Sequence, residues 1–206
     1  MTYLEFREQW HAEGCFNIYQ IRAWRPDFDR INLFRWVKKG YLSKLRQDWY
    51  AFSDIRRMPE TARFVAHKIY TPSYISLHTA LSFYGIIPEA VTVITSVTSN
   101  RPAMYSNDFG EFSYQTVKPA LFFGYKPMFL SPHNTYMLAF PEKAILDLLY
   151  LYPQYNTEEA LLDLRFDEYW MQEELNRDKL LAFSAQSGVK ALQSRVKLLL
   201  KTYRND

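Results

Sequence analysis

A change of hydrophobic period near Gly40 divides the first fifty residues into a helical part and a strand-like part. Residues 3–12 follow a helical pattern, and Asn17 stands where an N-cap would begin a second short helix. A third helix is predicted over residues 30–39, and Gly40 supplies the left-handed conformation that commonly ends a helix. Three short helices so close in sequence are expected to pack as one compact unit.

After the third helix, apolar and polar residues alternate. Residues 41–45 and 49–52 read as two strands, and the polar residues 46–48 read as the turn between them. Asp48 tolerates the left-handed conformation that such a turn needs, although less readily than glycine. The order helix, helix, helix, hairpin is that of a winged helix-turn-helix, and we predict this domain for residues 1–57.

The predicted third helix has an apolar and a polar side. At 100° per residue, four apolar side chains share one arc: Ile31, Leu33, Phe34 and Val37. Asn32, Arg35 and Lys39 lie opposite that arc, so we expect them to point away from the core. Trp36 falls beside Asn32 on the helical wheel, but a winged helix usually buries this position, and we predict that Trp36 is buried.

Basic residues gather around the same helix. The chain has 206 residues and a formal net charge of +3, and residues 1–58 hold 11 Lys and Arg against 7 Asp and Glu. Asn can pair with adenine and Arg with guanine in the major groove, so Asn32 and Arg35 are the expected base readers. The expected contacts with DNA phosphates are Arg30, Lys38, Lys39, Lys44 and Arg46. The alternative interpretation is a solvated basic helix face.

Residues 58–206 are expected to form a second domain, because helical and β-branched segments alternate along them. Helices are predicted over residues 61–70, 77–84 with Ser76 as N-cap, and 141–152; strands are predicted over residues 91–98, 111–117, 121–125 and 136–140. Residues 156–206 are predicted to be helical, with Thr157 and Asn176 as N-caps. The predicted fold class is α+β: an N-terminal winged helix-turn-helix, then a mixed α/β domain with a helical C-terminus.

An enzyme that acts on nucleic acid, a nuclease or a nucleotidyltransferase, is the alternative from another functional class. Lys143 and Asp147 are four residues apart on the helix predicted over residues 141–152, and we interpret them as a solvated ion pair on its outer face. The sequence has no P-loop, no Gly-Ser pair followed by spaced aspartates and only six glycines. We therefore expect no enzyme, no catalytic residue, no metal site and no cofactor.

Short motifs between residues 30 and 152 resemble those of one protein family. They are Pro72-Ser73-Tyr74-Ile75-Ser76-Leu77, Ala80-Leu81, Tyr84-Gly85, Ile87-Pro88-Glu89, Ile94-Thr95-Ser96-Val97-Thr98, Gly124-Tyr125, and Ala139 with Pro141-Glu142-Lys143-Ala144. Upstream, Lys39-Gly40-Tyr41-Leu42 and Leu45-Arg46 with Tyr50 are similar to the wing of that family. The chain thus resembles the AbiEi family of bacterial abortive-infection antitoxins. Members commonly carry Gly in the wing turn where this chain has Asp48, and residues after 152 match only loosely.

The resemblance implies an antitoxin of a type IV toxin-antitoxin system. Its winged helix would repress its own operon by binding inverted repeats in double-stranded promoter DNA. Its C-terminal domain would counteract a nucleotidyltransferase-like toxin, in that family without the need for a stable complex. The motifs identify no antitoxic residue. A protein-binding immunity module that does not bind DNA is a further alternative.

The last predicted helix has an apolar face and basic residues on its other faces. Val189, Leu192, Val196, Leu199 and Tyr203 recur at helical spacing, whereas Lys190, Arg195, Lys197, Lys201 and Arg204 occupy other positions with no acid among them. We interpret it as an amphipathic helix packed on its own domain; the alternative is a second nucleic-acid surface, or a contact with a toxin or a target RNA. Because Glu5 and Arg7 interrupt any N-terminal export signal and no apolar stretch is long enough for a bilayer, we expect a cytoplasmic protein with no membrane contact.

Overall fold

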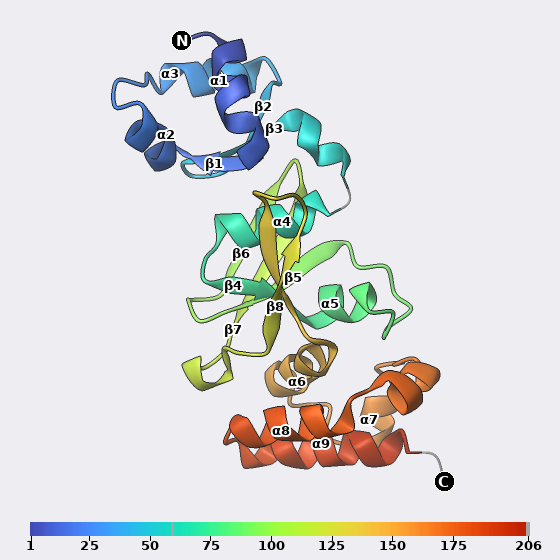
Figure 1. Ribbon diagram of the computed structural model, residues 1–206. Helices are drawn as coiled ribbons and strands as arrows, with labels where there is room; N and C mark the ends of the chain where they lie inside the picture. Colours follow the sequence, from blue (N-terminus) through green and yellow to red (C-terminus); the bar gives the residue numbers. More distant parts are fainter. Residues whose placement is uncertain (59, 205–206) are drawn as a thin grey trace.

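The computed structural model describes residues 1–58 and 60–204. The protein is α+β, as predicted: a small N-terminal unit, a central mixed sheet and a layer of C-terminal helices follow one another along the molecule (Figure 1). The two termini lie at opposite ends (Figure 1).

The N-terminal unit interleaves helices with short strands. In chain order its elements are α1 (Tyr3–Trp10), β1 (Cys15–Asn17), α2 (Ile18–Trp24), α3 (Ile31–Lys38), β2 (Leu42–Arg46) and β3 (Trp49–Phe52), followed by a 3-10 turn over Ser53–Arg57. The strands form an antiparallel sheet in the order β1-β3-β2. The sequence pattern does not predict β1, because three residues are too few to show an alternation.

Local signals explain where these elements begin and end. The Asn17 side chain accepts a hydrogen bond from the backbone N–H of Gln20, and the Gln20 side chain accepts one from the backbone N–H of Asn17. The predicted N-cap of α2 is thus confirmed as a reciprocal capping box. Gly40 ends α3 with a φ of 73°, and Asp48 occupies the turn between β2 and β3 with a φ of 62°. Both left-handed residues stand where the sequence predicts them.

Aromatic rings fill the core of the N-terminal unit. The ring of Phe6 lies 4.8 Å from that of Trp36 and 5.2 Å from that of Phe16, measured between centroids. Ring pairs at such distances add about 0.5–1.5 kcal/mol each beyond the burial of their area. Phe6 therefore joins α1 to α3 and to β1.

The central sheet has six strands in the order β6-β7-β5-β4-β9-β8. Their bounds are β4 (Ser73–Ile75), β5 (Val93–Thr98), β6 (Ala103–Asn107), β7 (Gly110–Thr116), β8 (Tyr125–Phe129) and β9 (Thr135–Ala139). β4 pairs parallel with β9 and antiparallel with β5, which in turn pairs parallel with β7. Antiparallel hairpins, β6–β7 and β8–β9, form the two edges.

The strand predicted over residues 121–125 is wrong. Pro119–Leu121 form a 3-10 turn, and β8 begins only at Tyr125. The apolar run between them is a half-buried loop that packs on the core: the ring of Phe122 lies 5.2 Å from that of Tyr74, and the ring of Phe123 lies 5.3 Å from that of Phe183. An apolar run alone cannot distinguish a strand from a loop that packs on the core.

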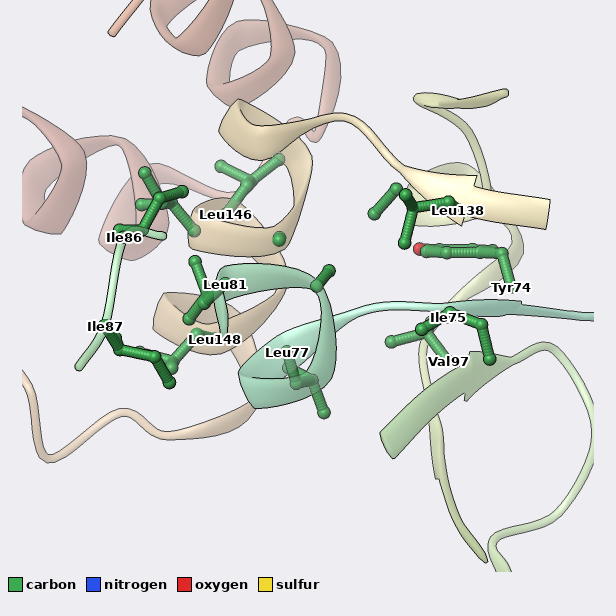
Figure 2. Packing of buried hydrophobic residues seen from close by; sticks show 14 of the residues in the cluster. Tyr74, Ile75, Leu77, Leu81, Ile86, Ile87, Val97, Leu138, Leu146 and Leu148 are labelled. Carbon is green, nitrogen blue, oxygen red and sulfur yellow. The ribbon is translucent and has the colours of Figure 1, made fainter. Parts of the chain in front are cut away.

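Helices pack on both sides of this sheet and beyond it. They are α4 (Thr61–Ile69), α5 (Leu77–Phe83), α6 (Pro141–Leu151), α7 (Glu158–Leu162), α8 (Arg177–Gln186) and α9 (Lys190–Thr202), with a π-helical turn over Trp170–Glu174. The predicted N-caps Thr157 and Asn176 are confirmed, because each side chain accepts a backbone hydrogen bond in the first turn of its helix. α6 lies between the sheet and the pair α8 and α9 (Figure 1). Figure 2 shows Leu81 of α5 and Leu148 of α6 pointing toward one another.

The two cores of the protein meet at the hairpin of β2 and β3. Leu42, Tyr50 and Phe52 belong to the core of the N-terminal unit, whereas Leu45 and Ala51 belong to the larger core. Successive residues of a strand point to opposite faces, so one hairpin serves both cores. The side-chain amide of Asn107 also donates to the backbone carbonyl of Leu45 at 3.0 Å. The boundary predicted near residue 57 stays a prediction.

Candidate nucleic-acid interface

Helix α3 exposes a different face from the one that the sequence predicts. Leu33 and Trp36 are buried as predicted, but Ile31 is 54% exposed and Phe34 is 71% exposed. The prediction that Ile31 and Phe34 face the core is therefore wrong. The exposed face consists of Ile31, Phe34, Arg35 and Lys38, and we call it the α3 face.

Trp36 explains this orientation of α3. Its ring centroid lies 4.8 Å from that of Phe6, 5.7 Å from that of Tyr3 and 6.1 Å from that of Phe28. At 100° per residue, Phe34 is about 160° around the helix from Trp36, and Ile31 is about 140°. Burial of the largest side chain of the helix thus forces the two smaller apolar side chains toward solvent.

The predicted base readers do not lie at equivalent places. Arg35 is exposed on the α3 face, whereas Asn32 is half-buried at its border with the core. Lys38 and Lys39 are both exposed at the C-terminal end of the helix. The structure therefore groups Arg35 with the two lysines and leaves Asn32 at the margin.

A shallow hollow connects the α3 face to the hairpin. It has a volume of about 190 Å³ and is lined by Arg30, Phe34, Val37, Lys44 and Tyr50. Lys44 is exposed on β2. Arg30 pairs with Asp48 at 2.5 Å, and a hydrogen bond to Tyr50 together with the Asp48 charge raises the pKa of Arg30. Three predicted phosphate contacts, Lys38, Lys39 and Lys44, thus remain free of acidic partners among the described residues.

Arg46 lies apart from this group. Its guanidinium donates to the backbone carbonyl of Ile69 at 2.6 Å and lies 4.8 Å from the ring centroid of Tyr105 and 5.7 Å from that of Tyr70. A β-bulge between Lys44 and Arg46 sends the two side chains to different surroundings. Arg46 therefore joins the hairpin to the second domain and does not extend the basic surface around α3.

A buried polar cluster lies inside the second domain, and it overturns the interpretation of Lys143 and Asp147 as a solvated pair. Both side chains are inaccessible to solvent, and the ammonium of Lys143 donates to Oδ1 of Asp147 and, at 2.9 Å, to the hydroxyl of Tyr74. The other carboxylate oxygen accepts from Tyr74 at 3.0 Å and from Ser76 at 2.8 Å. The Ser76 hydroxyl is therefore engaged with Asp147, and the predicted side-chain cap of α5 is absent.

Burial dominates the electrostatics of this cluster. It raises the pKa of Asp147, against the opposing effects of Lys143, Ser76 and Tyr74. Burial and the neighbouring carboxylate raise the pKa of Tyr74 well above its ordinary value. The sequence does contain a signal for this burial, because apolar residues at 144–146 and 148–149 occupy most of the circumference of α6, as in a helix surrounded by protein. With no path to solvent, the cluster connects β4 to α6 and offers no reactive surface.

The second domain also has an open hollow of about 360 Å³. Its lining is apolar except for six side chains with polar groups: His78, Glu89, Thr92, Thr95, Tyr155 and Asp163. Burial lowers the pKa of His78, while the Glu89 carboxylate opposes that effect. Across residues 1–58 and 60–204, no group of His, Cys, Asp and Glu side chains is arranged to hold a metal ion.

The last helix, α9, packs its apolar residues inward as predicted. Leu192, Val196, Leu199 and Tyr203 are buried. Lys190, Lys197, Lys201 and Arg204 are exposed along one face, whereas Arg195 is half-buried and donates to the backbone carbonyl of Pro153 at 3.4 Å. This basic face lies at the opposite end of the molecule from α3 (Figure 1).

Comparison with protein-family models and with curated protein sequences gave no match to the chain. In the part of the chain that the structure describes, no helix is long and apolar enough to cross a lipid bilayer.

Proposed function

We propose that residues 1–57 form a winged helix-turn-helix that binds double-stranded DNA through the α3 face. The element order α1-β1-α2-α3-β2-β3 and the sheet order β1-β3-β2 support this assignment. The observation that carries the proposal is the exposed face of α3, which presents Arg35 and Lys38 beside Lys39 and Lys44 with no acid on the helix. A cationic, solvent-facing helix of this kind suits the major groove.

The proposed contacts divide into readers and anchors. Arg35, which is exposed on this face, would pair with guanine O6 and N7 by two hydrogen bonds. Lys38, Lys39 and Lys44 would neutralise phosphates on either side of the groove. Asn32 is a weaker candidate for reading adenine than the sequence predicts, because its side chain is half-buried. Arg46 is removed from the proposed phosphate contacts because Ile69, Tyr70 and Tyr105 hold it.

A gel-shift titration of the full chain against the DNA upstream of its own gene tests this function. Arg35→Ala should weaken specific binding by about 1–3 kcal/mol and relax the choice of base at one position. Lys197→Ala, which removes an exposed cation from α9 at the far end of the molecule, is the matched control and should bind as the native chain does. If the native chain retards no DNA, the protein-binding module becomes the better explanation.

We further propose that the protein is a type IV antitoxin that represses its own operon and counteracts a nucleotidyltransferase-like toxin. The support is the resemblance of its motifs to the AbiEi family. Those motifs supply three of the four side chains of the buried cluster: Tyr74 and Ser76 come from one motif and Lys143 from another, while Asp147 lies outside them. They thus have a structural reason to occur together, and the resemblance concerns the core of the second domain more than any exposed surface.

The antitoxin proposal is tested by co-expression with the product of the neighbouring gene. Cells that carry the full chain should survive the toxin. The combined substitution Arg35→Ala and Lys38→Ala should abolish repression of a promoter reporter while protection continues, because both side chains are exposed on α3, which lies apart from the second domain (Figure 1). Loss of protection in this folded variant would contradict the separation of the two activities, and a failure of the native chain to protect would contradict the antitoxin function itself.

A further inference from the structure

Two of the four side chains of the α3 face are apolar. Phe34 and Ile31 lie three residues apart, so they are neighbours on one side of the helix, and both are more than half exposed. Arg35 and Lys38 share that side with them. A single exposed apolar residue needs no explanation, but an adjacent pair on a proposed contact surface does.

The surroundings of Phe34 restrict what can cover it. The hollow that it lines also receives the cations Arg30 and Lys44, and Asp48 already pairs with Arg30. An occupant of this surface must therefore combine negative charge with an apolar group. The major groove of DNA combines phosphates with the C5 methyl group of thymine, which is the apolar feature that distinguishes A·T pairs there.

We propose that Phe34, with Ile31 as its apolar neighbour on the helix, is the side chain that reads thymine methyl groups in the major groove. The inference rests on the proposed DNA-binding function and adds a base preference to it. On one helix face, Arg35 would select guanine while Phe34, one residue earlier, selects an adjoining thymine. Specific sites should therefore place thymine next to the guanine that Arg35 contacts.

The probe is a pair of duplexes that differ only in methyl groups. A duplex is first selected from a random pool by the full native chain, and each thymine in it is then replaced in turn by deoxyuridine, which keeps the base pairing and the O4 acceptor. Loss of one contacted methyl group should lower the affinity about fourfold, the factor that corresponds to one buried methylene-sized group. Replacements outside the contacted positions should change nothing.

Protein variants identify the reading side chain. Phe34→Ala should bind the thymine and deoxyuridine duplexes equally, with the salt dependence of the native chain, because the phosphate contacts are intact. Phe34→Leu keeps an apolar side chain and should retain part of the preference. Phe129→Ala removes a similarly exposed ring, 75% exposed on β8, and should retain all of it. Thermal unfolding of each variant verifies that it is folded, and Phe34→Leu supplies the test if Phe34→Ala is not.

The outcomes separate the inference from the function on which it rests. If the native chain selects no duplex from the pool, the proposed DNA binding fails and the inference fails with it. If it selects a duplex but binds the deoxyuridine versions equally well, the methyl reading alone is overturned. A methyl preference that survives in Phe34→Ala also overturns it. If sedimentation shows that Phe34→Ala loses self-association while its DNA discrimination is unchanged, a second copy of the chain covers Phe34 instead.

Discussion

Replacement of Lys143 by methionine should lower the free energy of unfolding by about 3 kcal/mol, and replacement of Asp147 by leucine should lower it by more. The structure gives the reason for the difference. Without Lys143, the carboxylate still accepts hydrogen bonds from Tyr74 and Ser76. Without Asp147, a buried ammonium loses its counter-ion and two hydroxyls lose their acceptor, each at a cost of about 1–3 kcal/mol.

These losses are large relative to the total free energy of unfolding of a domain. A folded domain is typically stable by about 5–15 kcal/mol, so Asp147→Leu should leave little margin. The double variant, with both Lys143→Met and Asp147→Leu, should recover the part of the loss that comes from the unpaired ammonium, because apolar residues of similar volume can replace a buried ion pair at little cost, while the hydroxyls of Tyr74 and Ser76 still lack their acceptor. Methionine also keeps the unbranched stem that packs against Gly124.

Urea unfolding followed by circular dichroism measures these differences, with equal slopes taken as the sign that the unfolded states are comparable. The matched control is Glu89→Gln, which breaks the exposed pair between Glu89 and Arg165 and should change the free energy of unfolding by no more than about 1 kcal/mol. The reasoning is refuted if Lys143→Met costs no more than this control. It is also refuted if the double variant is as unstable as the two single losses added together.

Three further predictions follow from individual side chains. Lys44→Ala should lower the slope of log DNA affinity against log salt concentration by about 0.9, because one phosphate contact is lost. Arg46→Ala should leave that slope unchanged and lower the free energy of unfolding by about 1–3 kcal/mol. A lower slope in Arg46→Ala would mean that this guanidinium contacts a phosphate. Burial lowers the pKa of His67 below 6.5, so the unfolded chain takes up a proton first as the pH falls. The free energy of unfolding should therefore decrease below about pH 6.5. Chemical unfolding at pH 7 and pH 5 should show a smaller decrease for His67→Gln than for the native chain, and an equal decrease would contradict the assignment to His67. Gly124→Ala would place a methyl group 3.0 Å from the buried side chain of Lys143 at a φ of 75°, and it should lower the free energy of unfolding by about 2–4 kcal/mol. Gly85→Ala should lower it by less, because φ is similar, at 70°, but the space around the added methyl group is open. Equal melting temperatures for the two variants would show that the contact with Lys143 relaxes.

Signals that act within a few residues are predictable from this sequence. The caps at Asn17, Thr157 and Asn176 and the left-handed Gly40 all appear where expected. Each depends on hydrogen bonds or backbone conformation inside one turn of the chain, so the rest of the fold has little influence on it. The overall α+β class follows from the sum of such local patterns.

Features that depend on distant neighbours are not predictable in the same way. The orientation of α3 depends on which aromatic side chain is buried in the core, and a helical wheel places Phe34 in the apolar arc and Trp36 beside Asn32 on the polar side. Only the contacts of Trp36 with α1 decide the matter. The burial of Lys143 likewise requires Tyr74 and Ser76, about seventy residues away in sequence, to supply its hydrogen-bonding environment. The orientation of α3 also determines which side chains form the α3 face. Phe34, the most exposed ring of that face, is therefore the residue whose position the sequence predicts least well.

The hairpin that serves both cores limits how this protein can exchange parts during evolution. The side of the hairpin that faces the second domain carries Leu45 and Ala51, which need an apolar neighbour. Recombination near residue 58 would expose Leu45 and Ala51 to water in the product that keeps the N-terminal unit. It would leave the larger core uncovered in the product that keeps the second domain. Intact transfer would have to carry α4 and the sheet edge with β6 along with the N-terminal unit, so the two units should be inherited together and diverge in step.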